Sequence, residues 1–591
     1  MRLHLCVSLI SLAAGTAHAA EYYVAPTGSD SNAGTMDAPF ATLQKGVNTA
    51  NAGDTLWIRG GTYKITTPAS GSAGVNFTKS GTSDSNRIKY WAYPGELPVI
   101  DFSGLVISTS GYTNGFNVTG SYLHFKGLEI ANVPMNMYSN NGVSVGGSAA
   151  YDIFESLNMH HNSGNGIFIG NKSGGGHLVL NCDAHDNYDP NSNQGMGQNA
   201  DGFGVHYQTS GATTIIRGCR AWWNSDDGYD LINQEIPVTV ESSWAMGNGY
   251  ANYGTTNPTD GNGNGFKMGS SKTGVRHLVR GNVAWKNKAS GFYANHSTGG
   301  NTWYNNTSFQ NGTQYNMLAS PADMPDVTIT LTGALAHIMR NNIGFPNRNS
   351  NMTGVDTMFN SWDLSLTPAN GDFASVSDPS VSGTGMSIES SGALGPRAPD
   401  GTMPKIDFLK LAAGSKFIDK GTDVGLPFVG TAPDLGAYEY GAATTTGAGG
   451  TTGGGGSTGA GGSTAAGTGG RGGAGGSAAT GGRGGTSGAA GSVGTGGVQT
   501  TGTGGAQTTG TGGMVSGTGG VVSGTGGEAG APAGTGGSSA AGTGGTVPGE
   551  SGSGGCACAL DARAGGVSTS ALIGLAALSS LLMRRGRRRR Q

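Results

Sequence analysis

The sequence predicts an all-β protein built as a right-handed, single-stranded parallel β-helix with an internal asparagine ladder. Three observations lead to this fold class. Short β-rich runs recur through the middle of the chain, each run leads to an asparagine, and in the first five copies a glycine and then an apolar residue follow it, insertions aside. Repeats of this kind are typical of solenoids, whose coils stack about 4.8 Å apart like neighbouring strands.

Seven asparagines occupy one position of the repeat. The short intervals between them are 24 or 25 residues and the long ones 36 to 39, so a long interval is one coil plus an insertion. An amide both donates and accepts, so inward-facing asparagines can bond one another and the turn backbone; surface turn asparagines are the alternative. The seven are Asn162, Asn187, Asn224, Asn248, Asn287, Asn311 and Asn347.

The glycine after each of the first five asparagines sets the register of the next strand. Strand side chains alternate between faces, so an inward residue after the glycine puts the following residue on the solvent face. The predicted inward row is Ile167, Phe203, Tyr229, Phe266 and Phe292, and the outward row is Phe168, Gly204, Asp230, Lys267 and Tyr293. Asp230 and Lys267 are therefore expected on adjacent coils.

Four aspartates are expected to converge beside this outward row. Asp201 and Asp227 directly precede their glycines on neighbouring coils, with Asp226 and Asp230 close by. Like charges this close repel, and Ca²⁺ accepts several aspartates in irregular geometry, whereas Mg²⁺ prefers few carboxylates. The pattern predicts a calcium site next to Lys267, although an isolated Asp-Asp-Gly run is more often a solvated turn.

Two insertions lie between a ladder asparagine and the glycine that follows it, at residues 188–198 and 249–263. Because they are two coils apart at the same place in the repeat, we expect them to project from one side of the helix and to flank the aspartates as walls of a groove. Tolerated surface insertions are the alternative.

Three motifs carry a family resemblance: NADGF at 199–203, CRAWWNSDDGYDLI at 219–232 and GNGFK at 263–267. They resemble family 9 polysaccharide lyases, the pectate lyases with a calcium-dependent β-helix, and the likeness extends from EYYVAPTGSDSNAGT near residue 21 to APDLGAYEY at 432–440. The resemblance implies that Asp201, Asp226, Asp227 and Asp230 bind one Ca²⁺ and that Lys267 is the catalytic base. The implied substrate is an acidic polysaccharide, polygalacturonate or pectin, cleaved by β-elimination to 4,5-unsaturated products.

The expected pH dependence follows from the charges around Lys267. A lysine normally titrates near about 10.4, and four aspartates, one Ca²⁺ and a bound uronate together carry negative charge, which raises the pKa further. Activity should therefore rise toward alkaline pH and vanish with a chelator.

Two other functions remain open at this point. One is a polygalacturonan hydrolase with paired carboxylates, although the chain lacks the Gly-His-Gly that polygalacturonases carry after their aspartates. The other is a noncatalytic surface polysaccharide-binding adhesin, in which Lys267 would only pair with Asp230. The chain carries a net charge of −3, and six of its arginines lie among residues 584–590, so the rest is acidic and argues against nucleic acid as a partner.

The remaining features concern the ends of the domain and its cysteines. Residues 39–51 predict a short amphipathic helix that caps the first coil. Cys182 and Cys219 occupy equivalent positions on adjacent coils and could form a disulfide, although stacking alone does not guarantee the geometry. We expect a monomer.

The sequence also predicts the domain organisation. Residues 1–19 read as a signal peptide, 20–441 as the β-helix, and 442–555 as a disordered Gly/Thr/Ser/Ala-rich linker. Residues 556–591 combine Cys556 and Cys558, an apolar transmembrane span and the arginine cluster, which resembles the C-terminal sorting signals of myxobacterial surface proteins. We expect an exported protein, at the cell surface or extracellular, anchored through this signal at Cys556 or Cys558.

Overall fold

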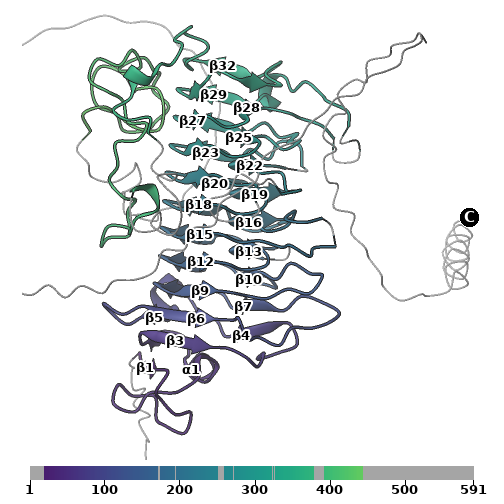
Figure 1. The fold of residues 1–591 in the computed structure, drawn as a ribbon, viewed down its shortest axis with the longest axis vertical. Helices are drawn as coiled ribbons and strands as arrows, with labels where there is room; N and C mark the ends of the chain where they lie inside the picture. Colours follow the sequence, from purple (N-terminus) through teal and green to yellow (C-terminus); the bar gives the residue numbers. More distant parts are fainter. Residues whose placement is uncertain are drawn as a thin grey trace, which may run out of the picture. The chain divides into compact units, whose positions relative to one another are not determined.

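The computed structural model describes residues 19–442, apart from 171–172, 194, 251–258, 271, 322–323, 325 and 378–391. Three parallel sheets run along the stacked coils (Figure 1), and each strand pairs with strands of the coils before and after it. This arrangement confirms the predicted parallel β-helix.

Sheet 1 contains, in spatial order, β1 (Glu21–Val24), β2 (Thr55–Ile58), β5 (Ile88–Ala92), β8 (Leu123–Lys126), β11 (Ile153–Glu155), β14 (Leu178–Leu180), β17 (Thr214–Arg217), β20 (Val238–Glu241), β23 (Leu278–Arg280), β26 (Thr302–Tyr304), β29 (Ile338–Arg340) and β32 (Asp356–Met358). Sheet 2 contains β4 (Ala73–Phe77), β7 (Asn114–Val118), β10 (Val143–Val145), β13 (Ile167–Ile169), β16 (Phe203–His206), β19 (Tyr229–Ile232), β22 (Phe266–Met268), β25 (Ser290–Tyr293), β28 (Thr313–Asn316) and β31 (Asn349–Ser350). Sheet 3 contains β3 (Gly61–Lys64), β6 (Pro98–Asp101), β9 (Glu129–Ala131), β12 (Asn158–His160), β15 (Asp183–His185), β18 (Arg220–Trp222), β21 (Trp244–Met246), β24 (Val283–Trp285), β27 (Thr307–Phe309) and β30 (Ile343–Phe345).

The predicted inward row forms an aromatic stack inside the coils. Ring centroids of Phe203, Tyr229, Phe266 and Phe292 follow one another at 4.9, 4.6 and 4.9 Å, and all four side chains are buried. The glycine before each of them is required by close packing: a Cβ at Gly228 would lie 2.7 Å from the carbonyl oxygen of the equivalent glycine on the next coil. The repeat of glycine and apolar residue thus results from the close stacking of the coils.

The asparagine ladder is present from Asn162 to Asn311. Each side-chain amide donates to the carboxamide oxygen one coil on, at 2.8 to 3.1 Å, and most also donate to a backbone carbonyl. The prediction for Asn347 was wrong, because this residue is exposed and the ladder ends one coil earlier. There Asn311 donates to the side-chain oxygens of Ser308 and Gln314, which replace the next asparagine.

Cys182 and Cys219 belong to a second ladder, at a different turn of the coil. The Cys182 N–H donates to the Cys219 sulfur, the Cys219 N–H to Ser243 Oγ, and the Ser243 N–H to Asn282 Oδ1. Asn282, Asn306, Asn342 and Asn360 continue it. Both cysteines are free, buried thiols, and burial raises the pKa of Cys182. The possible disulfide is therefore not formed: each sulfur accepts a backbone N–H, as the ladder residues do.

Helix α1 (Leu43–Thr49) lies at the end of the stack that holds β1 and covers the first coil (Figure 1). The Thr42 side chain accepts from the Lys45 N–H and begins the helix, and Leu43 and Val47 face the core. The predicted helical cap is confirmed, over a shorter range than 39–51.

The C-terminal part of the domain packs along sheet 3. Its short 3₁₀ turns are η3 (Asn370–Asp372) and η4 (Gly392–Leu394), while η1 (Asp84–Asn86) and η2 (Gly333–Leu335) lie in earlier coils. Phe373, Phe408 and Leu435 join the tryptophans of sheet 3 in a second hydrophobic cluster. Arg397 ties this part to the coils through Asp183, at 2.6 Å.

No helix in the described part of the chain has the length and apolar character that a membrane crossing requires. Residues 1–18 of the predicted signal peptide, the predicted linker beyond residue 442, and the predicted C-terminal signal with Cys556 and Cys558 lie outside the described residues.

Candidate active site

Three adjacent strands of sheet 2 carry the predicted site. Gly204 on β16 is aligned with Asp230 on β19, and Asp230 is aligned with Lys267 on β22, whose other neighbour is Tyr293 on β25. The outward row therefore has the predicted register, and Asp230 and Lys267 are cross-strand neighbours.

Asp201 and Asp227 are held by a third ladder, at the turn that precedes sheet 2. In this ladder each backbone N–H donates to the side-chain oxygen of the equivalent residue one coil earlier, at 2.6 to 3.1 Å. Its members are Asn114, Asn141, Asn165, Asp201, Asp227, Asn264 and Ser290. The two aspartates thus use one oxygen as an asparagine would, and the fold fixes where their carboxylates point.

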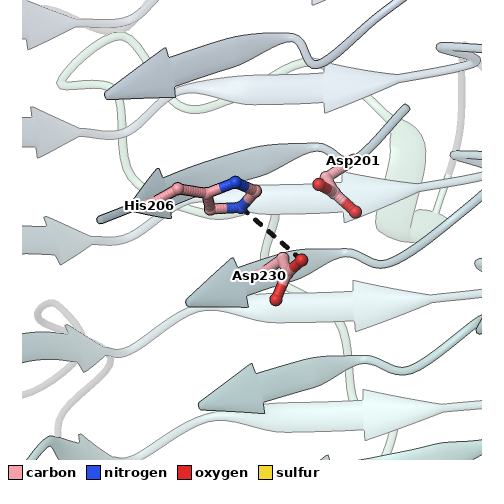
Figure 2. Close-up of side chains that lie close together, drawn as sticks. All are labelled: Asp201, His206 and Asp230. Carbon is pink, nitrogen blue, oxygen red and sulfur yellow. Dashed lines mark ion pairs between the residues drawn. The ribbon is translucent and has the colours of Figure 1, made fainter. Parts of the chain in front are cut away.

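The aspartates converge into two overlapping groups with the spacing of metal ligands. Ligand atoms of Asp201, Asp226 and Asp227 lie within 4.8 Å of one another, and so do those of Asp201, His206 and Asp230. Figure 2 shows the second group, in which His206 Nε2 lies 3.5 Å from Asp230 Oδ2. All of these side chains are buried or nearly so.

Lys267 lies against this cluster with its amine surrounded by oxygens. Its Nζ lies 2.9 Å from Asp227 Oδ2, 3.2 Å from Asp230 Oδ2 and 2.9 Å from Asn262 Oδ1. Burial alone would lower the pKa of Lys267, but the neighbouring carboxylates outweigh it and raise the pKa well above its usual value. The direction agrees with the expectation from the charge count.

The carboxylates are only partly neutralised by this amine. Burial and mutual repulsion raise the pKa of Asp201, Asp226 and Asp227. The pKa of Asp230 is lowered, because Lys267 and His206 outweigh its burial. In addition, Asp230 Oδ1 is buried without a hydrogen-bond partner among the described residues. The four carboxylates, with their excess negative charge and an unsatisfied oxygen, fit a hard divalent cation.

The five predicted residues are thus brought together, and sequence reasoning missed two of their neighbours. His206 lies two positions after Gly204 on the same face of β16, so the strand alternation that located Asp230 could have found it. Asn262 lies in the second insertion, where the repeat gives no register. Its backbone N–H donates to Asp226 Oδ1, and its side chain accepts from Lys267.

The two insertions meet beside Asp226. The Asp260 N–H donates to the Met196 carbonyl at 3.0 Å, and the Thr259 hydroxyl donates to the Ser225 carbonyl. The described residues of the two insertions therefore contact each other next to the aspartates, while the predicted groove stays a prediction.

A sequence model described as "Pel9A-like, right handed beta helix region" matches residues 22–351. The chain belongs to this Pel9A-like family. The family's description also confirms the predicted handedness of the coils.

Individual similar proteins match about 70% of the chain. The chain is 35% identical to pectate lyase L of Dickeya chrysanthemi, over 71% of this chain and 90% of that one. Among solved structures, pectate lyase Pel9A is 32% identical with a TM-score of 0.58, covering 72% of this chain and 97% of that chain. A structure titled "Rhamnogalacturonan lyase" is 31% identical with a TM-score of 0.59, covering 67% and 97%.

Proposed function

We propose that the chain is a pectate lyase that cleaves polygalacturonate by calcium-assisted β-elimination, with Lys267 as the base. The observation that carries this proposal is the convergence of four buried aspartates and one buried lysine on adjacent coils of a Pel9A-like domain. Relatives named pectate lyase at 32–36% identity support the substrate class.

Asp201, Asp226, Asp227 and Asp230 are the residues that would hold the Ca²⁺. A bound Ca²⁺ supplies a Lewis acid that draws charge from the uronate carboxylate and so acidifies the C5 proton. The third ladder keeps Asp201 and Asp227 in place, and His206 supports Asp230 from the neighbouring coil. These residues are then held before substrate arrives, which reduces the cost of ordering them.

Lys267 is proposed to remove the C5 proton while the O4 glycosidic oxygen leaves. To act, it must present a neutral amine, and its contacts with Asp227 and Asp230 favour the charged form. A cation held by these two carboxylates would share their charge and so reduce their preference for the charged amine. Burial of the amine acts in the same direction.

The test is ultraviolet absorbance on polygalacturonate, with and without a chelator, beside Lys267→Ala. A 4,5-unsaturated product that appears only with Ca²⁺ and only with Lys267 present supports the proposal. Reducing ends without ultraviolet absorbance would favour a hydrolase, and glycan binding unaffected by Lys267→Ala without cleavage would favour an adhesin.

A second substrate has a specific observation behind it, the structural match titled "Rhamnogalacturonan lyase". The same assay with rhamnogalacturonan decides between the two, since both eliminations give an unsaturated uronate. We expect the higher kcat/KM on polygalacturonate.

We also propose that the protein acts outside the cytoplasm. Two features of the sequence support this: residues 1–19 resemble an apolar signal peptide, and residues 556–591 contain cysteines, then an apolar span, then an arginine cluster. Cell fractionation of the native chain beside a chain ending at residue 555 tests this: the shorter chain should be released into the medium.

A further inference from the structure

Asn262 contacts both the base and a metal-ligand carboxylate, although it belongs to an insertion rather than to a strand. We propose that Asn262 is a positioning residue that holds the Lys267 amine in the reactive direction. This inference rests on the proposed function and adds a residue to it.

The three oxygens around the Lys267 amine differ in what they can do during the reaction. Asp227 and Asp230 are proposed cation ligands and carry negative charge, which favours a protonated amine. The Asn262 side-chain oxygen, 2.9 Å from Nζ, is the neutral member of the three. A neutral carbonyl oxygen accepts an N–H from an amine as well as from an ammonium. It can therefore orient the amine, and hence its lone pair, without adding the negative charge that would favour protonation.

The backbone of residues 259–262 is bound by Lys288 from a later coil and packs against the coil that carries Asp226 and Asp227. Lys288 Nζ donates to the carbonyls of Thr259 and Gly261, at 2.6 and 2.7 Å. Gly261 packs so closely that a Cβ there would lie 2.3 Å from the Ser225 carbonyl oxygen, so no other residue fits without a shift. These contacts fix Asn262 independently of Lys267, which is what a positioning residue requires.

The decisive variant is Asn262→Ala in the full chain. It removes the side-chain oxygen but keeps the backbone N–H that donates to Asp226. We expect kcat on polygalacturonate to fall about 10- to 100-fold, the loss typical of a misaligned reacting group. KM and the half-saturating Ca²⁺ concentration should each change less than about twofold, because cation and substrate contacts are kept.

A matched control is Asp260→Asn, a nearly isosteric change at an exposed side chain two residues away in the same segment. It should keep wild-type kcat.

Two results would overturn the proposal. One is an unchanged kcat in Asn262→Ala. The other is a kcat that recovers in high Ca²⁺, which would mean that Asn262 acts on the cation site instead. An inactive wild-type protein on both polymers would refute the proposed function itself, and this inference with it.

Discussion

The third ladder both holds the coils together and places two carboxylates in the site. Asp201→Asn separates these roles, because it keeps the ladder hydrogen bond and removes a charge from the site. Asp201 Oδ1 accepts the Asp227 N–H at 3.0 Å, as Asn165 Oδ1 accepts the Asp201 N–H one coil earlier. An asparagine at 201 can make the same bond, so the coil should form normally. What changes is one negative charge in a buried group of four.

The size of the effect follows from the spacing. At 4.8 Å, the limit within which ligand atoms of Asp201, Asp226 and Asp227 lie, each pair of unit charges repels by about 3.5 kcal/mol at an effective dielectric of about 20. Attraction to Lys267 offsets part of this, and protonation of a carboxyl with a raised pKa relieves more. We therefore expect Asp201→Asn to stabilise the protein in a chelator by about 1–3 kcal/mol, or roughly 1–3 °C in Tm for a domain of this size.

In excess Ca²⁺, wild type should be more stable than Asp201→Asn. Wild type gains RT ln(1 + [Ca²⁺]/Kd), about 2.7 kcal/mol at a hundredfold excess over Kd, whereas the variant lacks one ligand charge and gains less. Thermal unfolding in chelator and in excess Ca²⁺ measures both arms, with Asp260→Asn as the control for charge removal at an exposed site. A variant less stable than wild type in chelator, or with undiminished calcium stabilisation, would refute the reasoning.

Three further predictions concern the base, the pH response and the main ladder. Lys267→Ala should lower kcat about 10²–10⁴-fold while calcium still stabilises the protein, measured by ultraviolet rate and Tm; weaker calcium stabilisation would contradict the role as base. In a chelator, the free energy of unfolding, measured with denaturant, should increase as pH falls from about 8 to 5. The reason is that Asp201, Asp226 and Asp227 have raised pKa values, so the folded state binds more protons than the unfolded one. A free energy of unfolding that increases with pH would contradict this. Asn224→Ala leaves ladder groups unpaired and should cost about 1–3 kcal/mol by denaturant unfolding; no loss would argue against the ladder.

Much of the site was predictable because a strand has a period of two and a coil has a nearly constant length. Once the glycines fixed the start of each sheet 2 strand, Asp230 and Lys267 had to be neighbours, and the structure has that register. The same rule failed at Asn347, where no further glycine marks the register and Gln314 ends the ladder instead. The equivalent positions of Cys182 and Cys219 also suggested a disulfide. In the ladder, however, the Cys219 sulfur accepts the backbone N–H of Cys182 instead of bonding to its sulfur.

Asn262 shows where such reasoning stops. Strand residues inherit their neighbours from the repeat, whereas the path of an insertion is set by contacts that have no period. Here those contacts are the hydrogen bonds from the Lys288 amine to the carbonyls of Thr259 and Gly261, and the close packing of Gly261 against Ser225. The coils can thus place charges, while the insertion adds a neutral oxygen at the same spot. A solenoid that keeps its ladder and loses only the side-chain oxygen of Asn262 would therefore keep cation binding and alter catalysis, which is the division that Asp201→Asn and Asn262→Ala together test.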